Sequence, residues 1–143
     1  MLAAVVTARN YSEAINDIKK SRDADLIELR LDYVKKLDDK KLKNIIRICK
    51  KPVIVTVRKK TEGGFFSGNE KERIQILENA IKFNADYVDI EYPSDKNSIK
   101  NLIKNKKNSK VIVSYHNFKK TPANLINIYN NIKKSEPDFL ILL

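Results

Sequence analysis

The sequence has few of the residues from which disulfide scaffolds and metal centres are built. It contains one cysteine, Cys49, one histidine, His116, and no tryptophan. A single thiol cannot form an internal disulfide, and no His/Cys/Asp cluster in the sequence has the spacing of metal ligands. We therefore expect no bound metal and a protein of the reducing cytoplasm.

Long apolar runs and turn-forming residues are also scarce. No stretch of roughly 18 apolar residues occurs, which argues against a membrane span. The N-terminal apolar run follows no basic leader, so we interpret it as a first strand and not as a signal peptide. Glycine occurs three times and proline four times in 143 residues, of which 42% are hydrophobic. This composition excludes a linker-like chain and predicts a single domain over residues 1–143 with a sizeable core.

Negative charge is in deficit, since 29 Lys and Arg stand against 18 Asp and Glu, for a net charge of +11. One interpretation is a surface that attracts nucleic acid or an anionic ligand. The other is a lysine-rich composition spread over exposed helix faces. The lysines are scattered and few lie beside aromatic residues, so we favour the second interpretation and expect neither a nucleic-acid nor a membrane partner.

Apolar runs of period two alternate with patterns of period near 3.6 along the whole chain. The predicted strands are residues 3–8, 26–32, 53–58, 86–91, 111–116 and 138–143. The predicted helices lie between them: one capped by Ser12, then about 38–49, 70–83 and 94–107, and one that begins near Thr121 and Pro122. Connections of this length allow right-handed crossovers, so the pattern predicts a parallel sheet.

Polar residues share one face of the predicted strands. In 26–32 the side chains of Glu28 and Arg30 lie on the face opposite Ile27, Leu29 and Leu31. Later strands repeat the pattern with Thr56 and Arg58, with Asp89 and Glu91, and with Ser114 and His116. A doubly wound sheet is apolar on both faces, whereas a barrel opens into a polar mouth at the C-terminal ends of its strands. No glycine-rich nucleotide loop follows the first strand. We therefore expect an α/β fold, a parallel (β/α) TIM-type barrel, with about six strands and five helices of the eight-fold pattern.

The polar groups expected at this mouth suit a small anionic substrate. They are Glu28, Arg30, Arg58, Glu62, Glu91 and His116. Arginines beside carboxylates can bind a polyhydroxylated anion, and a histidine can transfer a proton near neutral pH. Alternatively, the charges satisfy one another and the histidine is a hydrogen-bonded core residue. For the set as a whole, placed at one end of one sheet face, we favour a site.

Four motifs carry a resemblance to a known family. They are ELRLD (28–32), TVRKKTEGG (56–64), DIE (89–91) and SYHNF followed by TP (114–122). In this order and at these intervals they resemble type I 3-dehydroquinate dehydratase, a class I aldolase-like barrel enzyme of the shikimate pathway. The resemblance covers nearly all of this chain but about the first two-thirds of the family's barrel. We therefore expect a domain that is incomplete at its C-terminal side.

The resemblance also implies residue roles. His116 matches the family's catalytic acid and base, while Glu28, Arg30, Arg58 and Glu62 match substrate-binding residues. The implied reaction needs no cofactor. A lysine forms an imine with 3-dehydroquinate, and loss of water then gives 3-dehydroshikimate.

One position departs from the family pattern. The imine lysine would stand three residues after Asp138, where this sequence has Ile141. We therefore expect this chain alone to lack that step. A non-catalytic hydroxy-acid binder or inactive remnant is the alternative function, and a basic nucleic-acid-binding domain is the third. The apolar last strand, at an exposed sheet edge, predicts self-association or a homodimer.

Overall fold

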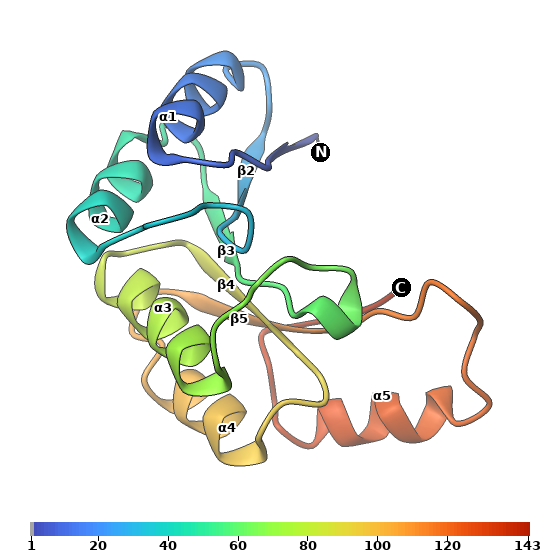
Figure 1. Ribbon diagram of the computed structural model, residues 1–143. Coiled ribbons are helices and arrows are strands. Elements are labelled where there is room, and N and C mark those ends of the chain that lie inside the picture. Colours follow the sequence, from blue (N-terminus) through green and yellow to red (C-terminus); the bar gives the residue numbers. More distant parts are fainter. Residues whose placement is uncertain (1) are drawn as a thin grey trace.

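The computed structural model describes residues 2–143, in which strands and helices alternate (Figure 1). The strands are β1 (Ala3–Val6), β2 (Leu26–Arg30), β3 (Val53–Thr56), β4 (Tyr87–Glu91), β5 (Lys110–Tyr115) and β6 (Phe139–Leu142). The helices are α1 (Tyr11–Lys20), α2 (Asp39–Ile48), α3 (Glu70–Lys82), α4 (Lys96–Lys104) and α5 (Leu125–Lys133), with a short 3₁₀ helix, η1 (Lys60–Glu62), after β3.

The six strands form one parallel sheet in the order of the chain, from β1 to β6. A doubly wound sheet reverses its strand order at a switch point, and this sheet does not. Each strand instead pairs with the next one along the chain, as in a (β/α) barrel. The predicted α/β barrel-type fold with six strands and five helices is confirmed.

The core lies between the sheet and the helices that cover its outer face. Val55, Val88 and Val111 follow one another across the sheet and are fully buried. They belong to one continuous hydrophobic cluster that includes Ile45 of α2 and Leu77 of α3. One face of each strand is therefore apolar and covered, which leaves the opposite face to carry the polar residues.

Helix boundaries differ from the sequence-based expectation at two places. Asn10, and not Ser12, caps α1, because Asn10 has extended backbone and its side chain accepts a hydrogen bond from the backbone N–H of Glu13. Helix α5 begins at Leu125, several residues after Thr121. Among residues 2–143, none of the helices is both long enough and apolar enough to cross a membrane.

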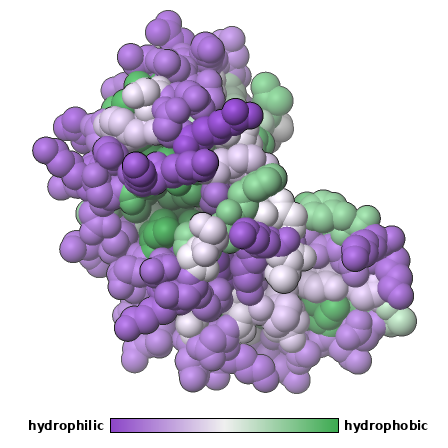
Figure 2. Space-filling model, in the orientation of Figure 1, coloured by the Kyte–Doolittle hydropathy of each residue, from purple (hydrophilic) through white to green (hydrophobic). Residues whose placement is uncertain are grey.

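The uncovered face of the sheet also has an apolar part, which includes residues of both edge strands. At the two edges of the sheet Val5 is 52% exposed and Phe139 is 46% exposed. The face of the molecule seen in Figure 2 is mainly hydrophilic, with separate hydrophobic areas. The polar residues of the same face lie toward the C-terminal ends of the strands.

Candidate active site

Arg58, just after β3, is the centre of a buried polar network. Its Nη1 donates a hydrogen bond to Nε2 of His116 at 2.7 Å. Its Nη2 forms an ion pair with Oδ2 of Asp89, also at 2.7 Å. Glu91 lies on its third side, with 3.7 Å between Arg58 Nε and Glu91 Oε1. All four side chains are buried, so these contacts are little weakened by solvent.

The hydrogen bonds of His116 define its tautomer. A guanidinium carries only N–H donors, so Nε2 of His116 accepts the bond from Arg58. The ring proton is then on Nδ1, which donates to Oε2 of Glu62 at 3.2 Å. The backbone N–H of His116 donates to the same oxygen. Glu62, His116 and Arg58 thus form a chain in which a carboxylate orients a neutral imidazole.

The loop after β3 returns on itself to place Glu62 beside His116. Gly63 ends η1 with a φ of +76°, a left-handed conformation that glycine adopts without strain. Gly64 then passes so close to the Arg58 carbonyl that a Cβ would overlap that oxygen. Glycine is therefore required at each of these two positions of the EGG motif for a different steric reason. Both glycines allow the loop to fold so that Glu62 lies beside His116.

Asp89 of β4 is a site residue that the sequence analysis did not select. Its Oδ1 accepts a hydrogen bond from the Ser114 hydroxyl at 2.6 Å, and its Oδ2 pairs with Arg58. Burial raises the pKa of Asp89 to about 6, and the charge of Arg58 and the bond from Ser114 oppose that rise. Asp89 could have been found from the sequence, because the alternation of side chains places it on the polar face of its strand.

Glu28 and Arg30 lie on β2, beside this network but outside its direct contacts. Glu28 accepts a hydrogen bond from the Thr56 hydroxyl at 2.9 Å. Arg30 forms a bidentate pair with Asp32 at 2.9 and 2.8 Å and lies over the ring of Tyr33. The structure therefore joins Arg58, Glu62 and His116 directly and places the other two predicted residues on the neighbouring strand.

His116 and Glu62 reach a solvent-accessible groove of about 640 Å³. Its wall includes Phe118, whose ring stacks on the imidazole with 6.0 Å between centroids, and the side chains of Lys59 and Lys119. A small molecule in this groove could contact the acid–base pair. Among residues 2–143, no group of three or more His, Cys, Asp or Glu side chains is placed to hold a metal ion.

Ile141 of β6 faces the same side of the sheet as His116. It pairs in register with Ser114 and is 37% exposed. This is the position at which the resemblance places the imine lysine. An aliphatic side chain there can pack against a ligand but cannot form a covalent bond with a ketone.

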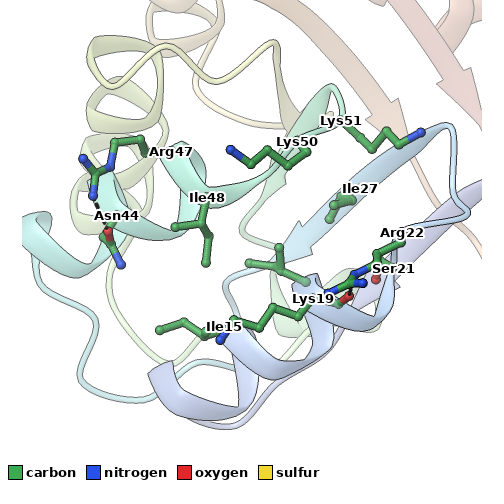
Figure 3. Close-up of a pocket in the computed structure, with 11 residues that line it drawn as sticks. Ile15, Lys19, Ser21, Arg22, Ile27, Asn44, Arg47, Ile48, Lys50 and Lys51 are labelled. Carbon is green, nitrogen blue, oxygen red and sulfur yellow. Dashed lines mark hydrogen bonds between the residues drawn. The ribbon is translucent and has the colours of Figure 1, made fainter.

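A second hollow of about 750 Å³ lies between α1 and α2 (Figure 3). Ile15, Ile27 and Ile48 give it an apolar floor, and lysines and arginines surround them. Ile27 and Lys51 lie near the N-terminal ends of their strands, whereas His116 follows the C-terminal end of β5. Among the described residues that line this hollow there is no carboxylate and no histidine, so it lacks the proton-transfer groups found at the other end of the sheet.

Comparisons with known proteins identify the family of the chain. The family model described as type I 3-dehydroquinase matches residues 2–142. The 3-dehydroquinate dehydratase of Methanococcus maripaludis strain S2 is 40% identical over 125 residues, which are 85% of this chain and 56% of the relative. That of Pyrococcus abyssi is 35% identical and covers 96% of this chain and 62% of the relative. The chain thus spans about 56% of the length of the first of these relatives.

Solved structures share the fold. The 3-dehydroquinate dehydratase of Enterococcus faecalis superposes with a TM-score of 0.87 at 24% identity, over 98% of this chain and 64% of that one. The enzyme of Aquifex aeolicus VF5 gives a TM-score of 0.78 at 27% identity, over 99% of this chain and 67% of that one. A 3-hexulose-6-phosphate synthase, at 16% identity and a TM-score of 0.70, shows the same fold and nothing more specific.

Proposed function

The chain belongs to the type I 3-dehydroquinase family, and from this membership we propose that its site is the substrate-binding and acid–base part of a 3-dehydroquinate dehydratase. The observation that carries the proposal is the buried chain from Glu62 through His116 to Arg58. The reaction removes a proton from the carbon beside a ketone and expels a hydroxyl group as water, giving 3-dehydroshikimate. It requires a group that can both take and return a proton.

We propose His116 for that proton transfer. Glu62 accepts from Nδ1 and so keeps the lone pair of the imidazole on Nε2. In the free protein this lone pair accepts a hydrogen bond from Arg58. A bound carboxylate or hydroxyl group that draws the guanidinium toward itself would free Nε2 to act as the base. The protonated ring would then act as the acid that assists the departing hydroxyl.

The other predicted residues suit the substrate, which is a polyhydroxylated carboxylate. Arg30 and Arg58 supply positive charge and fixed N–H donors, which favour carboxylate recognition. Glu28 and Glu62 supply acceptors for hydroxyl groups. In the free protein each of these four side chains is hydrogen-bonded to a neighbouring residue. These contacts hold the side chains in place before a ligand binds.

Ile141 favours a second candidate, a hydroxy-acid binder without catalysis. Its side chain occupies the place where the resemblance expects an amine, and an imine with the substrate requires one. The two candidates share the pocket and differ in the covalent step. We propose that the described residues bind 3-dehydroquinate and do not form the imine by themselves.

Two measurements on the full chain separate these possibilities. Thermal unfolding with and without 3-dehydroquinate reports binding, because a ligand that binds only the folded state raises the melting temperature. Borohydride reduction in the presence of 3-dehydroquinate, followed by mass spectrometry, reports an imine. We expect stabilisation without added mass, and the Arg58→Met variant should not be stabilised. Added mass would show that another lysine acts, whereas an unchanged melting temperature would contradict both candidates.

We further propose a cytoplasmic protein that associates with itself through the edges of the sheet. The half-exposed side chains of Val5 and Phe139 support this, since they lie on the two edge strands. We propose no nucleic-acid or membrane partner, because the lysines are dispersed over several helices and few lie beside aromatic residues.

A further inference from the structure

We propose that Arg73 of α3 is a positioning residue, which fixes Arg58 and through it the orientation and tautomer of His116. The inference rests on the proposed function, because it assigns a role in that site to a side chain of the helix layer. Arg73 is 1% exposed, although it is charged and lies in a helix on the outer side of the sheet. Charged side chains are rarely buried to this degree unless they are fully paired.

Every N–H group of Arg73 has a partner. Nε and Nη2 donate to the two carboxylate oxygens of Glu70 at 2.9 Å each, and Nη2 also donates to the Ser94 hydroxyl at 2.8 Å. Nη1 donates to the backbone carbonyl of Val57 at 3.2 Å and to Oε2 of Glu91. A guanidinium has five N–H donors, so the whole set is used and the group has one orientation.

These contacts hold the backbone on both sides of Arg58. The Val57 carbonyl, immediately before Arg58, accepts directly from Arg73. The Lys59 N–H, immediately after it, donates to Oε1 of Glu91 at 2.9 Å, and Arg73 holds the other oxygen of that carboxylate. Arg73 therefore determines where the Arg58 side chain leaves the backbone, although the two guanidinium groups share no hydrogen bond.

Arg73 also keeps Glu91 from competing with His116 for the guanidinium of Arg58. The Nε atom of Arg58 is buried without a hydrogen-bond partner, and Glu91 lies 3.7 Å from it. Without Arg73, Glu91 would be a buried carboxylate whose nearest cation is Arg58. Because an unpaired buried carboxylate is strongly unfavourable, Glu91 would draw the guanidinium toward itself. Arg58 would then leave Nε2 of His116, and the imidazole would lose the donor that sets its tautomer.

The test uses the fact that His116 is the one histidine of the sequence. Its imidazole ¹⁵N signals in the ligand-free protein report which ring nitrogen carries the proton. In the wild type we expect protonated Nδ1 and unprotonated Nε2. Arg73→Gln should move both signals toward the tautomer mixture of a free imidazole. Arg73→Lys, which can reach Glu91 but cannot hold all five acceptors, should give an intermediate shift.

Glu70→Gln is the matched control. It weakens the solvent-facing contact of the same guanidinium but leaves Glu91 and Val57 paired, so the His116 signals should stay at their wild-type positions. Folded Arg73 variants with unchanged His116 signals would overturn the inference and leave Arg73 a packing residue. If Arg73→Gln does not fold, the more conservative Arg73→Lys provides the test. Failure of the wild type to bind 3-dehydroquinate would contradict the proposed function instead, since the signals are recorded without ligand.

Discussion

At the scale of single residues, Asp89 is a buried carboxyl of the site whose titration is shifted by its surroundings. Burial raises its pKa to about 6, despite the guanidinium of Arg58. In the unfolded chain the same carboxyl titrates near its ordinary value of about 4. The folded protein therefore binds the proton more tightly than the unfolded chain between these values. The stability that this group contributes is full below about pH 4 and is lost as the pH rises through about 6.

Asp89→Asn removes this titration while keeping the shape of the side chain. We expect the free energy of unfolding of the wild type, relative to the variant, to fall by on the order of 3 kcal/mol between pH 4 and pH 7. Urea unfolding at several pH values across this range measures the difference. A difference that does not vary with pH would show that Asp89 titrates normally in the folded protein.

Ile141→Lys tests whether the missing amine is the one obstacle to chemistry. The side chain at this position lies on the inner face of the sheet opposite Ser114, next to the strand that leads to His116. We expect the variant to gain covalent mass on borohydride reduction with 3-dehydroquinate, and the wild type to gain none. Ile141→Met is the control of similar length without an amine. A folded lysine variant that binds the ligand and is never trapped would argue against this placement.

The residues of the site could be predicted in part. Arg58, Glu62 and His116 were predicted from strand alternation and from the motifs, and the structure brings them into contact. Arg73 could not be found in this way. A charged residue in a helix is normally solvent-exposed, and its burial here depends on Glu91, which is 18 residues away on the next strand.

At the scale of elements, the loop from Lys59 to Asn69 does most to build the site. Gly64→Ala would place a methyl group against the Arg58 carbonyl, which is backbone and cannot move aside without disturbing β3. Overpacking of this kind costs roughly 1–3 kcal/mol. We expect a loss of unfolding free energy in this range and a weakened Glu62–His116 contact.

Gly68→Ala is the matched control in the same loop. Its added methyl group would meet only side-chain atoms, the Glu72 carboxylate that accepts from the Asn69 N–H and the edge of the Phe66 ring. Side chains can shift where backbone cannot, so we expect a smaller loss of stability that is limited to the cap of α3. Chemical denaturation of both variants gives the comparison. An equal loss of stability for the two would contradict the specific role of the close approach at Gly64.

The hydrophobic pattern of the sequence predicts the helices and strands themselves better than it predicts where they begin and end. Helix α3 begins where expected because Asn69 and Glu72 form a capping box. In α1 both Asn10 and Ser12 are residue types that cap helices, and the sequence alone does not decide between them. The extended backbone at Asn10 does, since it lets that side chain reach the N–H of Glu13.

At the scale of the whole molecule, the described sheet has two edges and an uncovered apolar face. Val5, Phe139 and Ile141 are between 37% and 52% exposed there. Burying such surface favours association, while the net charge of +11 opposes it. We expect concentration-dependent self-association in sedimentation experiments that increases with added salt, because salt screens the charge repulsion.

Charged substitutions show whether the edges are responsible. Val5→Lys combined with Phe139→Lys should reduce association at constant salt. Two lysines at exposed apolar positions outside the edge strands, Ile126→Lys and Phe65→Lys, add the same charge and provide the control. A wild type that sediments as a monomer at all concentrations and salt conditions would contradict the proposed edge contact.

The overall architecture was predictable because the distribution of polar residues distinguishes two fold classes. Only one face of each strand is covered by helices, so the other could carry Glu28, Asp89 and His116. The strand order from β1 to β6 follows from the same pattern. The hydrogen-bond network that links these side chains depends on the distances between residues of different strands. The alternation of side chains along one strand does not predict these distances.

The groove beside His116 is the proposed binding site of 3-dehydroquinate. Because His116 is the one histidine of the chain, its imidazole signals during titration with 3-dehydroquinate report binding in this groove. We predict a saturable shift as the ligand displaces Arg58 from Nε2, and no such shift in Arg58→Met. Wild-type signals that do not move at millimolar 3-dehydroquinate would contradict the account.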